Sequence, residues 1–256
     1  MPDRSLADRP TVTTAGLGEV EGKERVLGIV GGTGPESTID YYRTLVATWR
    51  SRRPDGTYPR VIINSVEAGA VFRALGAGDF DAVGRVLGPA ITALESAGCQ
   101  RAFLASNASH LAFDRIDPPP TIPLIHIVDA ARDHAAKAGH HRLGLIGTRF
   151  VMESDLYSSR LGPVGIEVVV PTRDEREVVH GIYFGELVEG IIRDESRDAL
   201  TRVVATMRDR DRIDGIVLGG TELALILKDP TCAGIPVLNT AQIQVDAAVD
   251  WLLAPT

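Results

Sequence analysis

The sequence predicts an α/β fold made of two similar halves, each built around a parallel β-sheet. The first observation is a repeated pattern, in which a short apolar segment ends in a glycine-rich or small polar turn and helical spacing follows. It occurs at residues 25–49, 102–110 and 216–228. The second is an offset of about 115 residues from Leu27 to Leu143, which indicates an internal repeat. Because right-handed crossovers return the chain to the same sheet edge, such units favour parallel sheets.

The first half contains three strand–helix units in succession. Arg25 to Val30 is apolar and β-branched, and the turn Gly31 to Pro35 leads from it into helical spacing. The second strand ends at Asn64. The expected strands are residues 25–30, 60–64 and 102–105, and the expected helices are 37–49 and 84–98.

A loop with three successive prolines, Pro118 to Pro120, separates the halves. We place the first domain at 25–120 and the second at 121–240, after a leader, 1–24, that we expect to be disordered. The expected strands of the second half are 124–127, 143–146, 166–170 and 216–218, and the expected helices are 130–138, 223–228 and 241–253.

Composition excludes several classes of function. The formal charge is −7 without a Lys/Arg-rich run, which argues against nucleic acid or an anionic membrane as partner. Cys99 and Cys232 are too few for a disulfide framework and lack metal-ligand spacing, so no metal is expected. No apolar run reaches the roughly 20 residues of a membrane span, and the leader lacks the apolar core of a signal peptide. We therefore expect a cytoplasmic protein.

Two polar turns mark the predicted ligand site. Ser106 and Asn107 follow one apolar segment, and Gly219 to Glu222 follow another. Ligands of open α/β sheets bind outside the carboxyl ends of the strands, where helix N-termini offer free N–H groups to an anion. The turn at Gly31 to Pro35 does not have the Gly-x-Gly-x-x-Gly spacing of a dinucleotide site, and no nucleotide cofactor is expected.

These turns carry a resemblance. Together with the opening Gly28 to Pro35, and with Pro171 to Glu175 followed by His180 to Tyr183, they resemble the motifs of the aspartate/glutamate racemase family over roughly residues 25 to 250. The resemblance implies two similar flavodoxin-like parallel-sheet domains with the site at their interface and a final helix, 241–253, that packs back on the first half. It also implies a homodimer and chemistry that is independent of pyridoxal phosphate and of other cofactors.

The family's two catalytic cysteines are missing at the matching positions. Ser106 stands at the first and Gly220 at the second. A thiol with a pKa near 8.5 can be tuned into a base, whereas a serine hydroxyl needs a strong activating partner and glycine offers no side chain. We therefore expect no two-thiol racemisation.

The residues that remain suit the binding of a carboxylate. Ser106 is interpreted either as a helix N-cap or as a donor to a substrate carboxylate or enolate oxygen. Ala108 departs from the family's threonine and loses one donor, and Gly220 leaves open space. The predicted substrate-binding residues are Thr33, Asn64, Asn107, Ala108, Thr148, Gly220 and Thr221.

A replacement base must come from another residue. The catalytic candidates are Ser106, Glu67, Glu177 and His180. Each of the last three could instead be a solvated or structural residue. The same two interpretations apply to His110. Glu222 is expected to orient its turn or a neighbouring histidine. Glu177 stands where family members with acidic substrates have a lysine. The family's arginine is matched by Ala70, or is shifted to Arg73. The side-chain carboxylate of aspartate or glutamate would therefore lack a positively charged partner.

Three functions remain open. The first is a racemase-like isomerase, lyase or cyclase that stabilises charge next to the carboxylate of a small or amino-acid-like substrate. The second is a catalytically inactive carboxylate-binding homologue, and the third an amino-acid racemase with a replacement base. A structural homo-oligomer with a collapsed site would instead pack Ser106 against Thr221. A buried base aimed at Ser106 would favour an enzyme.

Overall fold

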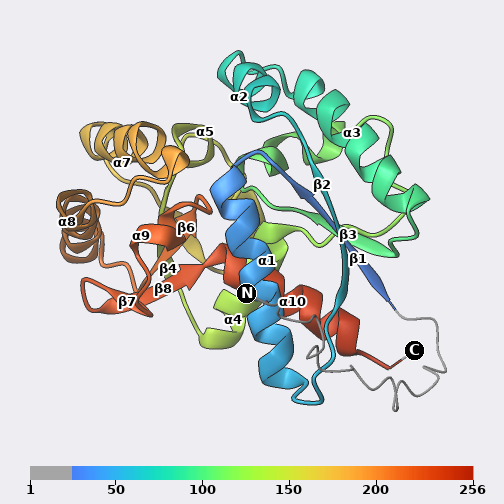
Figure 1. Ribbon diagram of the computed structural model, residues 1–256. Coiled ribbons are helices and arrows are strands. Elements are labelled where there is room, and N and C mark those ends of the chain that lie inside the picture. Colours follow the sequence, from blue (N-terminus) through green and yellow to red (C-terminus); the bar gives the residue numbers. More distant parts are fainter. Residues whose placement is uncertain (1–24, 256) are drawn as a thin grey trace, which may run out of the picture.

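The computed structural model describes residues 25–255 and has the predicted α/β architecture with two sheets, parallel throughout except for the antiparallel edge strand Thr231–Cys232 (Figure 1). The predicted leader, 1–24, lies outside the described residues. The first sheet has the order β2-β1-β3, from β1 (Val26–Gly31), β2 (Arg60–Ser65) and β3 (Arg101–Leu104). The second has the order β5-β4-β6-β8-β7, from β4 (Arg142–Gly147), β5 (Glu167–Val169), β6 (Gly215–Gly219), β7 (Thr231–Cys232) and β8 (Ile235–Asn239).

The two sheets repeat one strand order, which agrees with the internal repeat in the sequence. The first strand of each half, β1 and β4, pairs in parallel with the second and third strands of that half. On the far side of β3, Leu124 forms a single parallel bridge with Ala102, as β8 pairs with β6. The strand expected at 124–127 is reduced to this bridge, because His126 caps a helix that already begins at Ile127.

The expected helices are all present with changed bounds. The described α-helices are α1 (Pro35–Arg52), α2 (Ala68–Gly76), α3 (Phe80–Ser96), α4 (Ile127–Ala138), α5 (Arg149–Met152), α6 (Ser158–Leu161), α7 (Arg173–Gly185), α8 (Asp194–Asp211), α9 (Leu223–Ile226) and α10 (Thr240–Leu253). Of these, α1, α3, α4 and α10 begin earlier than expected, whereas α9 is shorter and ends at Ile226. Short 3₁₀ turns occur at Ala108–Arg115, Gly162–Val164 and Leu187–Glu189.

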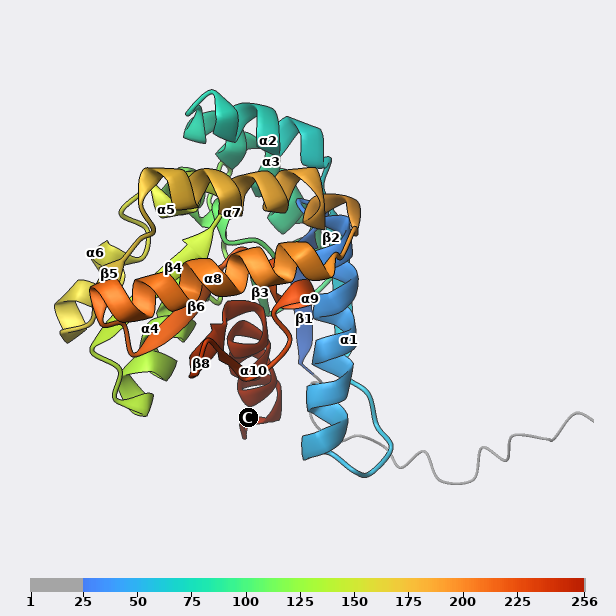
Figure 2. The ribbon, with the colours of Figure 1, turned by 90° about the vertical axis from the view of Figure 1, so that its left-hand side faces the viewer.

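Several elements were not expected from the sequence, although their signals are present. Helix α8 is rich in charge, yet it buries Leu200, Val203, Val204 and Met207 at helical spacing. Helix α2 is short and begins after Glu67, whose carboxylate accepts from the N–H groups of Gly69 and Ala70. Helix α7 contains the His180 to Tyr183 stretch, and α7 and α8 lie side by side in one layer (Figure 2).

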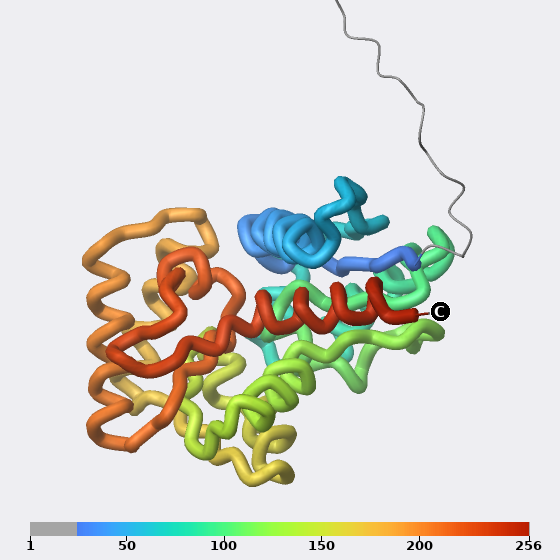
Figure 3. The backbone as a smooth tube through the Cα atoms, turned by 90° about the horizontal axis from the view of Figure 1, so that it is seen from below, coloured from blue at the N-terminus to red at the C-terminus, as the bar shows by residue number. Residues whose placement is uncertain are grey.

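The last helix, α10, packs against α1 and α4 (Figure 3). Its apolar residues join a buried cluster that includes the centre of the first sheet: Leu27, Ile29, Tyr41, Leu45, Trp49, Phe103, Ala105, Ala241, Val245, Ala248 and Val249. At its N-terminus, Asn239 at the end of β8 caps the helix. Helix α10 therefore connects the second sheet to the core of the first.

Within residues 25–255, none of the helices is both long and apolar enough to span a membrane.

Candidate functional site

Turns from both sheets converge on one pocket. Its lining comes from the ends of β1, β3, β4 and β6, together with one residue each from α2 and α7. This is where the carboxyl ends of parallel strands are expected to meet a ligand. The lining residues are Thr33, Gly34, Phe72, Ser106, Asn107, Ala108, Thr148, Tyr183, Gly219, Gly220, Thr221 and Glu222.

The predicted site residues fall into two groups. The pocket brings together Thr33, Ser106, Asn107, Ala108, Thr148, Gly220 and Thr221. Asn64 is not among the lining residues; its amide donates to the carbonyl of Ala90 at 3.1 Å, beneath α3.

None of the three predicted replacement bases lines this pocket. Glu67 is exposed and caps α2, and the N–H donors of Ala70 and Gly69 lower the pKa of its carboxyl. Glu177 is exposed and pairs with Arg149. His180 is half-buried and accepts from the Arg149 N–H at 3.1 Å, and burial lowers its pKa.

Ser106 lies at the entrance to the 3₁₀ turn after β3. Its side chain is 7 % exposed, and its hydroxyl accepts from the Ser109 N–H at 3.3 Å, so it has the N-cap contact that its position suggested. It also lines the pocket. This contact does not use the Ser106 proton, because a hydroxyl that accepts one bond can still donate. The role as a donor to a substrate oxygen stays a prediction.

Asn107 joins the two halves through its side chain. Its Oδ1 accepts from the Tyr157 hydroxyl, and its Nδ2 donates to Thr240 Oγ1 at 3.1 Å. Thr240 in turn donates to the carbonyl of Leu218 in β6 at 2.7 Å. The network fixes the turn after β3 against the end of β6.

The ring of Tyr183 fills the space beside the Cα atom of Gly220. A methyl group on its Cα would lie 2.4 Å from Cε2 of Tyr183 and 3.1 Å from the Tyr183 hydroxyl oxygen. The space expected to be open at this position is therefore occupied by a phenol. Tyr183 was not among the residues selected from the sequence, although the motif from His180 to Tyr183 contains it.

Glu222 is the one carboxylate among the lining residues. It is 3 % exposed and accepts from the Tyr183 hydroxyl and, at 3.0 Å, from Thr221 Oγ1. A methyl group on Gly34 would lie 1.8 Å from its Oε1, so the glycine turn of the first half admits this carboxylate. Glu222 does contact its own turn, as expected, but its other side-chain partner is a tyrosine rather than a histidine.

Burial keeps the Tyr183 phenol protonated. The pKa of Tyr183 is raised well above its ordinary value of 10, first by burial and then by the adjacent Glu222 charge. A neutral phenol donates its proton to the carboxylate, which matches the hydrogen bond seen.

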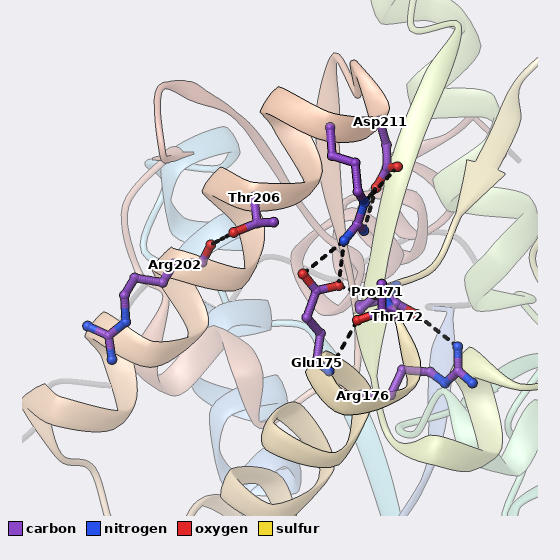
Figure 4. Close-up of polar contacts among 8 residues, drawn as sticks. Pro171, Thr172, Glu175, Arg176, Arg202, Thr206 and Asp211 are labelled. Atoms are coloured by element: carbon purple, nitrogen blue, oxygen red, sulfur yellow. Dashed lines mark hydrogen bonds and ion pairs between the residues drawn. The ribbon is translucent and has the colours of Figure 1, made fainter.

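Helix α7, which carries Tyr183, is fixed at its N-terminus (Figure 4). Thr172 and Glu175 form a capping box, with Thr172 N donating to Glu175 Oε2 at 2.7 Å. Glu175 also pairs with Arg210 of α8 at 3.0 Å. Farther along α7, Phe184 contacts Phe72 of α2, with ring centroids 5.3 Å apart, so the helix also packs on the first half.

Two buried histidines lie behind Ser106. His110 Nδ1 donates to the Ser106 carbonyl at 2.7 Å, and its Nε2 accepts from the Ile127 N–H at 3.2 Å, which fixes the tautomer of a neutral ring. Burial, followed by His126, holds the pKa of His110 well below 6.5. His110 thus supports the turn, and it is not among the lining residues.

Neither cysteine lines the pocket. Cys99 lies in the core of the first half and Cys232 in β7, and burial raises the pKa of both thiols. Within residues 25–255, His, Cys, Asp and Glu side chains form no group of three that could hold a metal ion.

The pocket is narrow. The space that its side chains leave free is close to that of a single water molecule. Tyr183 and Phe72 stand in this lining, so a ligand larger than water requires movement of these rings or of the helices that carry them.

The fold and the pocket define an α/β protein with two similar halves and a pocket between their strand ends. Residues 30–248 match the family model described as Asp/Glu/Hydantoin racemase. The chain belongs to this Asp/Glu/hydantoin racemase family.

Solved structures agree with this assignment. A protein described as a candidate Asp/Glu racemase from Yersinia pestis is 33 % identical, with a TM-score of 0.80 over 90 % of this chain and 100 % of that one. An aspartate racemase homologue from Pyrococcus horikoshii is 31 % identical, with a TM-score of 0.78 and the same coverage. Picrophilus torridus aspartate racemase, at 18 % identity, covers 89 % of this chain and 94 % of its own with a TM-score of 0.68, and shows the shared fold.

Proposed function

We propose that this chain is a cofactor-independent isomerase or lyase of the racemase superfamily. It acts on a small carboxylate or amino-acid-like substrate by stabilising charge next to the carboxylate, without two thiols. The observation that carries this proposal is a pocket lined by polar turns from both sheets, with neither Cys99 nor Cys232 among its lining residues.

The lining supports carboxylate binding through neutral donors. The hydroxyls of Thr33, Ser106 and Thr148 and the amide of Asn107 belong to turns whose backbone N–H groups begin helical segments. Fixed donors of this kind stabilise an enediolate as it forms, because they need little reorganisation.

The charges of the pocket argue against a dicarboxylate substrate. Its described lining contains no lysine or arginine, and its one carboxylate is Glu222. Arg73 of α2 is 76 % exposed at its side chain and pairs with Glu67 instead. A second substrate carboxylate would therefore meet a like charge without a counter-ion. An α-ammonium group is compatible with Glu222, so neutral amino acids fit better than aspartate or glutamate.

Proton–deuterium exchange at the α-carbon tests this function. NMR in D2O would follow alanine, serine, leucine, methionine, aspartate, glutamate, lactate and succinate in contact with the purified protein. We expect exchange or product formation with neutral members of the panel and none with aspartate or glutamate. Ser106→Ala should slow the reaction about 100-fold, the order found when one donor to a developing oxyanion is removed.

The alternative is a catalytically inactive carboxylate-binding homologue. The absence of Glu67, Glu177 and His180 from the described lining favours it, because none of these predicted bases faces the pocket. Binding of panel members without exchange or product would support this alternative and contradict the enzyme proposal.

A further inference from the structure

The pair formed by Tyr183 and Glu222 has no part in the sequence-based account of the site. Both residues line the pocket, and both are almost fully buried, at 5 % and 3 % exposure. The phenol donates directly to the carboxylate. A buried phenol that donates to a buried carboxylate is an arrangement that can move a proton.

The position of the phenol oxygen is defined by Gly220. It lies 3.1 Å from the point at which a Cβ atom of residue 220 would stand. A side chain on that residue would project into the space that the phenol occupies. Tyr183 therefore brings a proton-carrying group to the place where the resemblance expects the second thiol.

Glu222 lies where negative charge is stabilised. Its Oε1 approaches Gly34, the residue that precedes the first turn of the 18-residue helix α1. The positive end of a helix dipole favours a carboxylate at this position. Thr221 Oγ1 donates a further hydrogen bond at 3.0 Å. Two hydroxyl donors, from Tyr183 and Thr221, therefore converge on the Glu222 carboxylate.

We propose that Tyr183 and Glu222 form a proton relay that takes the place of the missing second thiol. The relay rests on the proposed function and supplies its base. As the bond between the α-carbon and its hydrogen breaks, the Tyr183 oxygen takes that proton and its own proton passes to Glu222. The electron pair stays on the substrate as an enediolate, which Ser106 and the backbone N–H groups of the turns stabilise. Reversal of both transfers restores the starting groups.

A single base has a stereochemical signature. One relay removes and returns the proton on the same face of the substrate. Once the proton held by Tyr183 has exchanged with D2O, reversal places deuterium on the α-carbon with retention of configuration. Two opposed thiols would instead couple exchange to inversion. The probes are L-alanine and D-alanine in D2O, followed by NMR for deuterium and by chiral chromatography for configuration.

Substitutions of the pair test the relay directly. Tyr183→Phe and Glu222→Gln should each lower the exchange rate by about 100-fold or more, the scale of general acid–base catalysis, and should leave KM within a few-fold. Tyr41→Phe is the matched control, because the buried Tyr41 hydroxyl bonds Gln244 at 2.7 Å in the packing of α1 against α10. The Tyr41→Phe variant loses a comparable buried hydrogen bond and should keep the wild-type exchange rate.

Gly34→Ala tests the relay without altering either member. The backbone of Gly34 is extended, with φ −126° and ψ 107°, so alanine fits the backbone, but its methyl group would displace the Glu222 carboxylate. We expect a loss of exchange similar to that of Glu222→Gln, in a protein whose circular dichroism is unchanged.

The outcomes separate the relay from the proposed function. Exchange at the wild-type rate in folded Tyr183→Phe or Glu222→Gln would overturn the relay and leave the proposed function in place. Inversion coupled to exchange would also overturn it. Absence of exchange from the wild-type protein with every member of the panel would overturn both.

Discussion

At the scale of single residues, the position of the Tyr183 ring requires glycine at residue 220. Glycine at this turn makes room for the ring, since any β-carbon would come within 2.4 Å of it. The ring in turn lets its hydroxyl reach Glu222. A tyrosine hydroxyl therefore stands beside this turn, where residue 220 itself has no side chain.

His126 predicts how stability depends on pH. Burial, with Arg160 and Arg132 nearby, lowers the pKa of His126 to about 3, against about 6.5 in an unfolded chain. The folded state thus binds fewer protons between these values, and stability is lost as pH falls below about 6.5. His126→Asn keeps a cap acceptor for the Val128 N–H, and it should reduce this slope by up to about 1.4 kcal/mol per pH unit.

Urea unfolding from pH 7 to pH 5 measures this slope. The exposed His134 offers a matched control, since His134→Asn changes a side chain that is in water in both states. Equal slopes for the wild type and His126→Asn would contradict the account.

Local sequence signals predicted the turns that line the pocket but not the presence of Tyr183 among the lining residues. Ser106 and Gly220 follow apolar strands directly, so the rule for strand ends located them. Tyr183 lies on a helix that precedes Gly220 by a whole helix and strand, and no local pattern tells which buried tyrosine reaches a distant turn. Glu67, Glu177 and His180 were chosen for nearness to motifs, but tertiary packing places them outside the lining.

At the scale of elements, the cap at the N-terminus of α7 stabilises the helix that carries Tyr183 into the pocket lining. Thr172→Ala removes one of the two hydrogen bonds of the capping box, the one that the Thr172 hydroxyl accepts from the Glu175 N–H, and should lower the free energy of unfolding by about 1 kcal/mol. Thr172→Ser keeps the hydroxyl and should cost much less. Urea denaturation of the three proteins checks the order, and an alanine variant as stable as the serine variant would disprove the role of the cap.

The positions of helices and strands were predictable where apolar residues recur at a regular helix or strand spacing along the whole element. The strands at β1, β4 and β6 and the final helix α10 have such patterns. Helix α8 was missed because its charged residues conceal a narrow apolar stripe, and the strand at 124–127 was too long because the cap at His126 was not recognised. Helix caps and narrow apolar stripes therefore determine where these elements begin and end, and the overall apolar content of a segment does not predict those boundaries.

At the scale of the whole molecule, the repeat in the sequence becomes a site shared between two sheets. The ends of β1 and β3 face those of β4 and β6 across one pocket, and α10 and the Asn107 network hold the halves together. The offset of about 115 residues predicted this arrangement, because equivalent turns of a repeat are brought to equivalent strand ends. The homodimer stays a prediction.

The central claim is that the chemistry of this chain does not depend on a thiol. The most direct test is α-proton exchange by a Cys99→Ala/Cys232→Ala variant, with L-alanine and the other amino acids of the panel in D2O. Both cysteines are buried outside the pocket, so we expect the wild-type exchange rate with a modest loss of thermal stability. Loss of exchange in a variant that remains folded by circular dichroism would contradict the account.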